Sequence, residues 1–337
     1  MKTALVLGGG GLVGMAYHAG ALKALDEAGL DLAAADLMIG TSAGSILSSY
    51  MRCGWSPDDF YNYAHGRHPD VQKDPAAPRD QIRQIFTPMW HTNVERARRL
   101  VGSTFAMAAS RGYLNRAGTP GRALRKAFPA GMYSTDETRL RFHEDLPVEW
   151  PDRDLYICAV DLYSGDLVPF GHRDAPQAPL PDAVLASTSI PGVFPPVRIG
   201  DKRYVDGGAK SATSLNLATQ EECTHIICVA PLGFRSDGFT TSRDPKMWGP
   251  MFVRSLFARA LKREVSEARN LGVEVFVVRP WATDLKMHGT NSMRHFDRAA
   301  LSDQAREGTK RLLDEMSDRP ALAEWPRKRA TRVRAAR

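Results

Sequence analysis

Short apolar runs and longer amphipathic segments alternate along most of the chain. The apolar runs predict buried strands at residues 3–7, 37–39, 154–161, 225–230 and 273–278. Helical periodicity predicts helices at residues 15–28, 45–51, 180–188, about 245–270 and about 302–316. Continuous apolar strands that alternate with helices are typical of a mainly parallel sheet. The pattern therefore predicts an α/β fold in which a central sheet is flanked by helices.

The hydrophobic pattern changes between about residues 55 and 150. A helix is expected near its start, because Ser56-Pro57-Asp58-Asp59 contains residues that favour helix N-termini. Further helices are expected at residues 81–86, 93–110 and 120–128, and no strong strand pattern is present. We interpret this stretch as a helical insertion in the α/β core, of the kind that often carries substrate selection.

Two turns with glycine follow the insertion. Residues 162–168 predict a hairpin through Ser-Gly-Asp. Farther on, the short strand Tyr204-Val205 leads into Asp206-Gly207-Gly208. Taken by itself, Asp-Gly-Gly favours an ordinary hairpin turn and gives Asp206 no chemical role.

Composition and charge are those of a globular protein with a basic end. The chain has 337 residues, 43% hydrophobic and 25% charged, with a net charge of +7. Much of that excess lies in residues 326–337, which have almost no apolar content. We expect one domain over residues 1–320 and a basic, disordered tail over residues 321–337. Attraction of the tail to anionic lipid is a weaker hypothesis, and no pattern indicates a nucleic-acid partner.

Neither a metal nor a cofactor is expected. Cys53, Cys158, Cys223 and Cys228 lack metal-ligand spacing, and we interpret them as buried free thiols of a reducing compartment. The apolar N-terminal run is too short for a signal peptide, and no run approaches the ~20 residues that a membrane span needs. A cytoplasmic location is therefore expected. Peripheral contact with a membrane and export without an N-terminal signal stay open.

The segment Gly40-Thr41-Ser42-Ala43-Gly44 has the G-x-S-x-G pattern between a predicted strand and a predicted helix. In that context the pattern is typical of a nucleophile elbow, with a strained central residue at positive φ. The residues two before and two after crowd the backbone, so both must be small, as Gly40 and Gly44 are. The pattern predicts Ser42 as a nucleophile, and an ordinary Gly-Ser turn is the alternative.

A glycine-rich loop, residues 8–14, joins the first strand to the first helix. Gly9, Gly11 and Gly14 fit the dinucleotide pattern G-x-G-x-x-G, but the acidic residue required at the end of the second strand is missing. A second interpretation is an oxyanion hole, in which backbone N–H groups of the loop face the nucleophile. The third is a tight turn that needs glycine for packing.

In combination these motifs resemble the patatin-like phospholipase family. Three blocks match in order: residues 8–14, which begin with Gly8 and end with Gly14, residues 40–44, and Asp206-Gly207-Gly208. Residues 186–197, which precede Asp206, are also similar to the family. The resemblance covers about residues 3–54 and 153–315. It implies a three-layer sandwich and a Ser–Asp dyad without histidine, with Ser42 as nucleophile and Asp206 as base. It also implies oxyanion donors at Gly9, Gly10 and Gly11. Val13 departs from the family, because many members have Arg or Lys there.

The chemistry of such a dyad is consistent in itself. A serine hydroxyl needs a base, and an ordinary Asp with a pKa near ~3.9 is too weak a base at neutral pH unless its surroundings raise that value. We predict a serine lipid acyl hydrolase of the phospholipase A, lysophospholipase or esterase type, with a lipid or acyl-ester substrate. Head group, acyl length, sn-position and oligomeric state stay open.

Three other functions compete with this prediction. An α/β-hydrolase esterase would use a histidine after Asp206, and His225, His288 and His295 are available. An acyltransferase usually has a histidine beside the elbow, where this chain has Thr41. A nucleotide- or lipid-binding regulatory protein with a vestigial site is the alternative that is not an enzyme.

Overall fold

A central sheet organises the protein in the computed structural model, which describes residues 1–70, 86–111, 127–235, 248–288, 297–316 and 318–328. The described strands run in the order β5–β6–β3–β2–β1–β7–β8, and β4 pairs with β3 beside this path. Five strands are parallel to one another: β1 (Thr3–Leu7), β2 (Leu37–Thr41), β3 (Asp154–Asp161), β7 (His225–Val229) and β8 (Glu274–Val278). Three antiparallel strands complete it: β4 (Leu167–Phe170), β5 (Val197–Ile199) and β6 (Lys202–Asp206).

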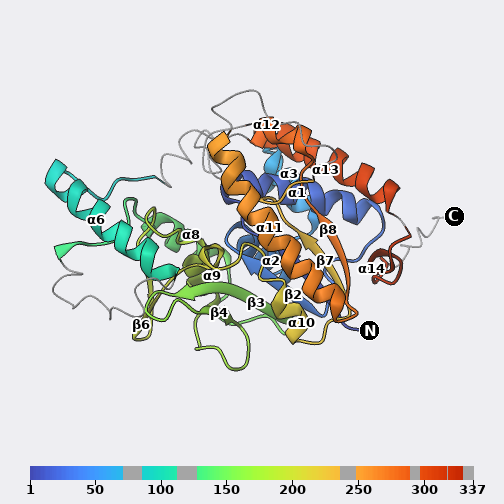
Figure 1. The fold of residues 1–337 in the computed structure, drawn as a ribbon, viewed down its shortest axis with the longest axis horizontal. Coiled ribbons are helices and arrows are strands. Elements are labelled where there is room, and N and C mark those ends of the chain that lie inside the picture. The colour runs from blue at the N-terminus through green and yellow to red at the C-terminus, as the bar shows by residue number, and fades with distance from the viewer. Residues whose placement is uncertain (71–85, 112–126, 236–247, 289–296, 317, 329–337) are drawn as a thin grey trace.

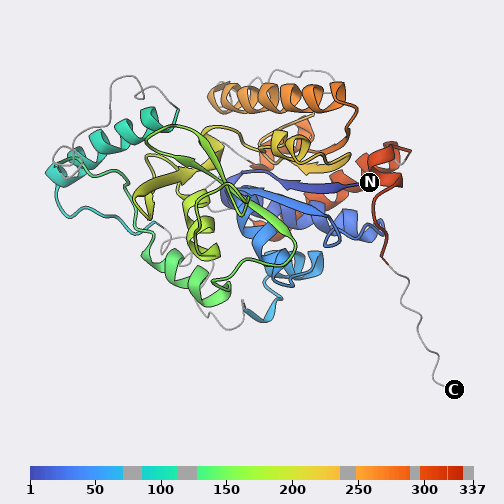
Figure 2. The same ribbon diagram turned by 90° about the horizontal axis from the view of Figure 1, so that it is seen from below.

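Helices cover both faces of this sheet (Figure 2). One face carries α1 (Gly11–Glu27), α2 (Ala43–Arg52), α9 (Leu180–Thr188) and α13 (Arg298–Glu315). The other carries α10 (Asn216–Gln220) and α11 (Trp248–Asn270). This is the predicted α/β architecture, a central sheet between two layers of helices.

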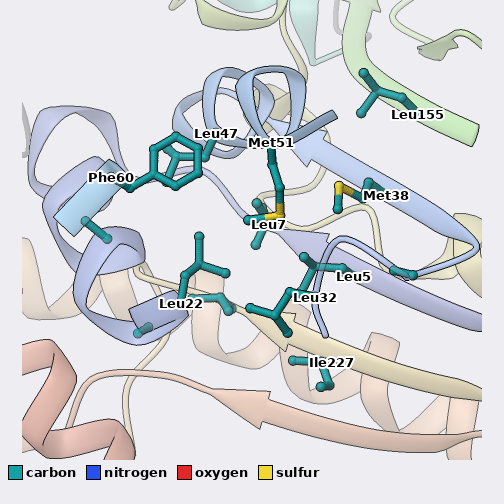
Figure 3. Packing of buried hydrophobic residues seen from close by; sticks show 14 of the residues in the cluster. Leu5, Leu7, Leu22, Leu32, Met38, Leu47, Met51, Phe60, Leu155 and Ile227 are labelled. Carbon is teal, nitrogen blue, oxygen red and sulfur yellow. The ribbon is translucent and has the colours of Figure 1, made fainter. Parts of the chain in front are cut away.

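Alternate residues of each parallel strand pack into the two hydrophobic cores, one on each face of the sheet. Leu5 and Leu7 of β1 point into the α1/α2 side, while Ala4 and Val6 point into the α11 side, and all four are fully buried. Figure 3 shows the first core, in which the strand residues Leu5, Leu7, Met38 and Ile227 face Leu22, Leu47, Met51 and Phe60 of the helices. Because both faces are covered, the parallel strands are apolar throughout rather than alternating.

The stretch between α2 and β3 consists, where it is described, of helices joined by irregular segments. It contains α3 (Pro57–Ala64), α6 (Asn93–Ser110) and α8 (Asp136–Asp145). Helix α3 begins at Pro57, as predicted, and Ser56 and Asp59 form a capping box there. The helices expected at residues 81–86 and 120–128 lie mostly outside the described residues. In Figure 1, α6 projects at one end of the molecule, far from α13 and α14.

Two element boundaries differ from the prediction for local reasons. Helix α1 begins at Gly11 rather than at Met15, because Gly11, Leu12 and Gly14 give no apolar periodicity although the backbone is already helical. Strand β5 was not predicted, because three prolines precede it and only three residues pair with β6. Short helical turns complete the described chain: η1 (Gly207–Ala209), η3 (Ala282–Asp284), α12 (Leu285–His288) and α14 (Pro320–Ala323).

The disordered tail was predicted to begin at residue 321, but the folded domain continues beyond that residue. Trp325 is 1% exposed, and its indole N–H donates to the Asp31 carbonyl over 3.1 Å. The Asp31 N–H donates to the Pro326 carbonyl at 2.8 Å, and Lys328 pairs with Asp26 at 2.5 Å. Residues 321–328 therefore belong to the folded domain. The boundary was misplaced because the end of the chain is basic overall, although it contains three buried apolar residues, Ala321, Leu322 and Trp325.

The cysteines and the membrane prediction have simple outcomes. Cys158, Cys223 and Cys228 are buried free thiols, as expected, whereas Cys53 is exposed because it follows the last turn of α2. Within the described ranges, none of the helices combines the length and the apolar character needed to cross a bilayer.

Candidate active site

Ser42 occupies a strained turn between β2 and α2. Its φ is 53° and its ψ is −120°, a positive-φ conformation that costs free energy in any residue except glycine. The turn closes only because its neighbours are small. A Cβ at Gly44 would collide with the Leu7 carbonyl, and one at Gly40 would lie 2.6 Å from the Ser45 Cα. The predicted elbow conformation of Ser42 is thus confirmed.

Side chains from three elements hold the turn in place. The Ser42 N–H donates to the Ser187 hydroxyl of α9 over 3.0 Å, and that hydroxyl donates to the Cys158 carbonyl of β3 over 2.7 Å. The Ser45 hydroxyl donates to the Ser42 carbonyl at 2.6 Å. No role was predicted for Ser187 from the sequence. Its only signal was its position in the segment 186–197.

Strand β3 brings Asp206 to Ser42. Thr41 of β2 lies opposite Cys158 of β3, and the next β3 residue, Ala159, lies opposite Asp206 of β6. Ser42 follows Thr41, so the serine and the carboxylate flank β3 at the same level. The Ser42 hydroxyl faces the buried Asp206 carboxylate closely enough to lower the pKa of that carboxyl. Two residues that are 164 positions apart in the chain therefore form one buried pair, 7% and 4% exposed.

Burial gives Asp206 the properties of a base that works near neutral pH. Removal from water raises the pKa of Asp206 to about 6, although the Ser42 hydroxyl and the Gly208 N–H act in the opposite direction. The Gly208 N–H lies 2.7 Å from Oδ1. A Cβ at Gly207 would collide with the Cys158 carbonyl, so glycine is required there. At neutral pH the carboxylate is largely ionised and is a stronger base than a solvent-exposed Asp.

The glycine-rich loop lies against Ser42 at the start of α1. A Cβ at Gly9 would lie 3.3 Å from the Ser42 Cβ. The Gly9 N–H, however, donates to the Ala212 carbonyl at 2.8 Å. Because this N–H is already hydrogen-bonded, we do not include Gly9 among the oxyanion donors proposed below. Gly10 and Gly11 begin α1, where the first N–H groups have no intrahelical acceptor. In the described part of the chain these two N–H groups donate to no other atom.

Buried polar side chains fix the loop from both sides of the sheet. His18 of α1 contacts the Gly8 carbonyl through Nε2 at 2.7 Å. Burial lowers the pKa of His18 to about 4, so the ring is neutral and Nε2 carries the donated proton. On the other side, the hydroxyls of Ser211 and Thr213 each donate to Glu264 at 2.5 Å, which holds the segment that carries Ala212. Neither His18 nor Glu264 was predicted from the sequence, because isolated polar residues on helices form no motif.

The described histidines do not complete a triad. His225 begins β7, so it lies at the end of the strands opposite Ser42, where it pairs with Glu324 at 3.1 Å. His288 packs against Tyr17 and contacts Arg254 at 3.4 Å. Among the described residues no histidine hydrogen-bonds to Asp206, and His295 lies outside them. The described chain also holds no group of three or more His, Cys, Asp or Glu side chains arranged for a metal.

The fold and the site define an α/β protein with a serine and a carboxylate paired at the ends of its parallel strands. A family model described as patatin-like phospholipase matches residues 5–219, more than half of the chain. The chain therefore belongs to the patatin-like phospholipase family. The resemblance that the three sequence blocks indicated is confirmed.

Relatives and solved structures give the extent of the similarity. Uncharacterized NTE family proteins of Mycobacterium bovis and Mycobacterium tuberculosis are 27% identical over 226 residues, 67% of this chain. The chain spans 29% of the length of these relatives. VipD from Legionella pneumophila aligns with 93% of this chain and 67% of its own, at 16% identity and a TM-score of 0.44. The heterodimeric complex ExoU–SpcU from the type III secretion system of Pseudomonas aeruginosa aligns with 93% of this chain and 51% of its own. The sequence identity is 20% and the TM-score is 0.38.

Proposed function

We propose that this protein is a serine lipid acyl hydrolase in which Ser42 is the nucleophile and Asp206 is its base. The observation that carries the proposal is the buried pair of Ser42 and Asp206, which adjoin β3 at the same level, with the serine on a strained elbow. Membership of the patatin-like phospholipase family supports a lipid ester as the substrate.

The proposed reaction has two half-reactions. The Ser42 Oγ attacks the ester carbonyl carbon while Asp206 accepts the hydroxyl proton. The carbonyl oxygen becomes an oxyanion, which the N–H groups of Gly10 and Gly11 stabilise at the start of α1. When the tetrahedral intermediate collapses, the alcohol leaves with the proton from Asp206, and the acyl group stays on Ser42. Water then attacks the acyl-enzyme, Asp206 accepts its proton and returns it to the Ser42 oxygen, and the fatty acid is released.

Covalent labelling tests the nucleophile directly. A fluorophosphonate probe should add one label to the wild-type protein and none to Ser42→Ala, with the labelled site located by peptide mass spectrometry. Hydrolysis of 4-nitrophenyl butyrate should fall to background in Ser42→Ala, whose circular dichroism spectrum should match that of the wild type. A Ser42→Ala variant that keeps near-wild-type turnover would show that the assignment of the nucleophile is wrong.

The same assay separates the dyad from its competitors. In a dyad, Asp206→Asn removes activity while His225→Gln, His288→Gln and His295→Gln retain it. In an α/β-hydrolase one histidine is as indispensable as the serine. A regulatory binding protein would leave Ser42 unlabelled in the wild type. Thr41 is fully buried beside the elbow and is not a histidine, which disfavours an acyltransferase.

A further inference from the structure

Helix α6 presents its large apolar side chains to solvent. Five of the eleven exposed large hydrophobic residues in the described chain lie on it, and the other six are scattered over separate places. We call this set the α6 surface; it consists of Val94, Leu100, Val101, Phe105 and Met107, with exposed fractions from 41% to 69%. Such a cluster on a single element is a sign of an interaction site, whereas isolated exposed apolar residues are normal.

The opposite face of α6 attaches the helix to the protein through small residues. Gly102, Ser103, Ala106 and Ser110 are buried. A Cβ at Gly102 would collide with the Phe128 carbonyl, and the Ser103 hydroxyl accepts a hydrogen bond from the Gly131 N–H at 3.1 Å. The helix is therefore anchored by its small face, and its five large apolar side chains stay at least 41% exposed. This is the reverse of a helix that packs its large apolar residues into a core.

Three arginines lie along the same helix, and the charge of Arg99 interacts with the Glu95 carboxylate in the first turn. Arg98 donates to the Ala127 carbonyl at 2.6 Å, Arg99 donates to the Gly131 carbonyl at 3.0 Å, and Arg96 lies 5.8 Å from the centre of the Trp90 ring. Within the described residues, neither Arg96 nor Arg98 forms an ion pair with a carboxylate. The positive charges of Arg96 and Arg98 are thus available to an anionic partner.

We propose that the α6 surface docks onto a lipid bilayer that contains anionic lipid. Large apolar side chains beside arginines on one helix are the pattern of a helix that lies in the membrane interface. In the proposed complex the positive charges of Arg96 and Arg98 lie near the anionic head groups and attract them. A membrane requires no shaped partner surface, which suits a convex helix at one end of the molecule (Figure 1).

The position of α6 also connects the membrane to the candidate active site. Met107 and Ser103 lie against Gly192, in the segment between α9 and β5. The same segment begins at Ser189, whose carbonyl accepts the Asp206 N–H at 2.9 Å. A protein docked through α6 would therefore hold Ser42 and Asp206 close to the lipid surface that supplies the ester. This link to substrate rests on the proposed function, whereas docking itself does not require it.

Vesicle binding tests the proposal with matched variants. The triple variant Val94→Gln/Val101→Gln/Phe105→Gln replaces exposed apolar side chains with polar residues that keep helix propensity. Its control, Leu140→Gln/Leu271→Gln, changes two exposed leucines away from α6, 60% and 72% exposed. Co-sedimentation with phosphatidylcholine vesicles containing phosphatidylglycerol should show binding of the wild type and the control. Affinity of the triple variant should fall by about tenfold or more.

The contribution of charge is measured on the same vesicles. Arg96→Gln/Arg98→Gln should weaken binding by about fivefold for each charge at low salt, with little effect at high salt or on pure phosphatidylcholine. The control Arg259→Gln/Lys262→Gln removes two exposed charges from α11 and should bind as the wild type does. Hydrolysis of 4-nitrophenyl butyrate should be unchanged in all four variants, because that soluble ester needs no membrane.

Three outcomes would overturn the proposal. The first is equal vesicle binding by the wild type and the triple variant, and the second is no binding by the wild type. The third is a wild-type dimer in light scattering that becomes monomeric in the triple variant without vesicle binding, which would make a second copy the partner. Absence of ester hydrolysis with intact, α6-dependent vesicle binding would refute the proposed function and leave the docking surface standing.

Discussion

The Ser187 hydroxyl accepts a hydrogen bond from the backbone N–H of Ser42 at 3.0 Å and donates one to the Cys158 carbonyl at 2.7 Å. A side chain of α9 thereby connects the strained turn after β2 to the middle of β3. The elbow is held by tertiary contacts as well as by its glycines, and the positive φ of Ser42 depends on both.

Loss of this bridge should disturb the elbow. Ser187→Ala leaves the Ser42 N–H buried without an acceptor, which should lower the free energy of unfolding by about 1–3 kcal/mol and reduce kcat for soluble esters. Ser49→Ala on α2 is the matched control, because Ser49 is fully buried and its hydroxyl has no partner in the described chain. Urea unfolding and steady-state kinetics would measure both. Identical behaviour of the two variants would remove the bridging role of Ser187.

The pH profile should report Asp206. A protonated carboxyl cannot accept the Ser42 proton, and burial raises the pKa of Asp206 to about 6. Ester hydrolysis by the free enzyme, measured as kcat/KM, should therefore rise with pH through a midpoint near 6 and then level off. A midpoint near 4 would show that Asp206 titrates like an exposed carboxylate and would contradict the buried-base assignment.

Asp206→Asn should remove activity and increase stability at neutral pH. The folded state raises the pKa of Asp206 from the ordinary 3.8 to about 6. Between these two pH values, Asp206 is therefore protonated in the folded protein and ionised in the unfolded chain. Stability from this group therefore falls as pH rises through that window and stays lower above it. Asparagine carries no charge to bury, so the variant should gain up to about 3 kcal/mol above pH 6 and little below pH 4. Equal stabilisation at both pH values would exclude the ionisation as its cause.

Two glycines of the first loop should respond differently to alanine. A Cβ at Gly10 would lie 2.7 Å from the Gly14 Cα and 3.0 Å from the Pro231 Cβ, so Gly10→Ala should displace the proposed oxyanion donors and reduce kcat by about tenfold or more. A Cβ at Gly14 would make ordinary contacts at 3.6 Å and 3.7 Å, and alanine favours the helix there. Gly14→Ala should keep activity and thermal stability. Tight NAD binding by the wild type would instead favour the dinucleotide interpretation.

The end of the described chain should divide into a structural and a dispensable part. Trp325→Ala removes a fully buried indole and its hydrogen bond to Asp31, which should cost about 3–5 kcal/mol of unfolding free energy. A chain ending at Lys328 should unfold at the wild-type temperature and hydrolyse soluble esters normally. Differential scanning calorimetry compares the two. A large loss of stability in the shortened chain would assign a structural role to residues 329–337.

Much of the site was visible in the sequence because it depends on local geometry. The strand, turn and helix around Ser42 are adjacent in the chain, and the turn admits only small residues at Gly40 and Gly44. The apolar strands and the helical pattern between them predicted the sheet and its layers for the same local reason. The proposed role of Asp206 was predicted only because three motifs occur in the order that the family has, since Asp-Gly-Gly in isolation is an ordinary turn.

The tertiary structure decided what depends on residues distant in the chain. The Gly9 N–H is engaged by Ala212, and Ser42 is held by Ser187, because strand register and helix packing bring these segments together. The raised pKa of Asp206 comes from burial by many elements, which no local pattern encodes. Trp325 is buried in the core although the residues that follow it are basic. The large apolar residues of α6 are exposed because the helix packs against the protein through its small residues. Periodicity shows that a helix has an apolar face, but only packing decides whether that face is buried.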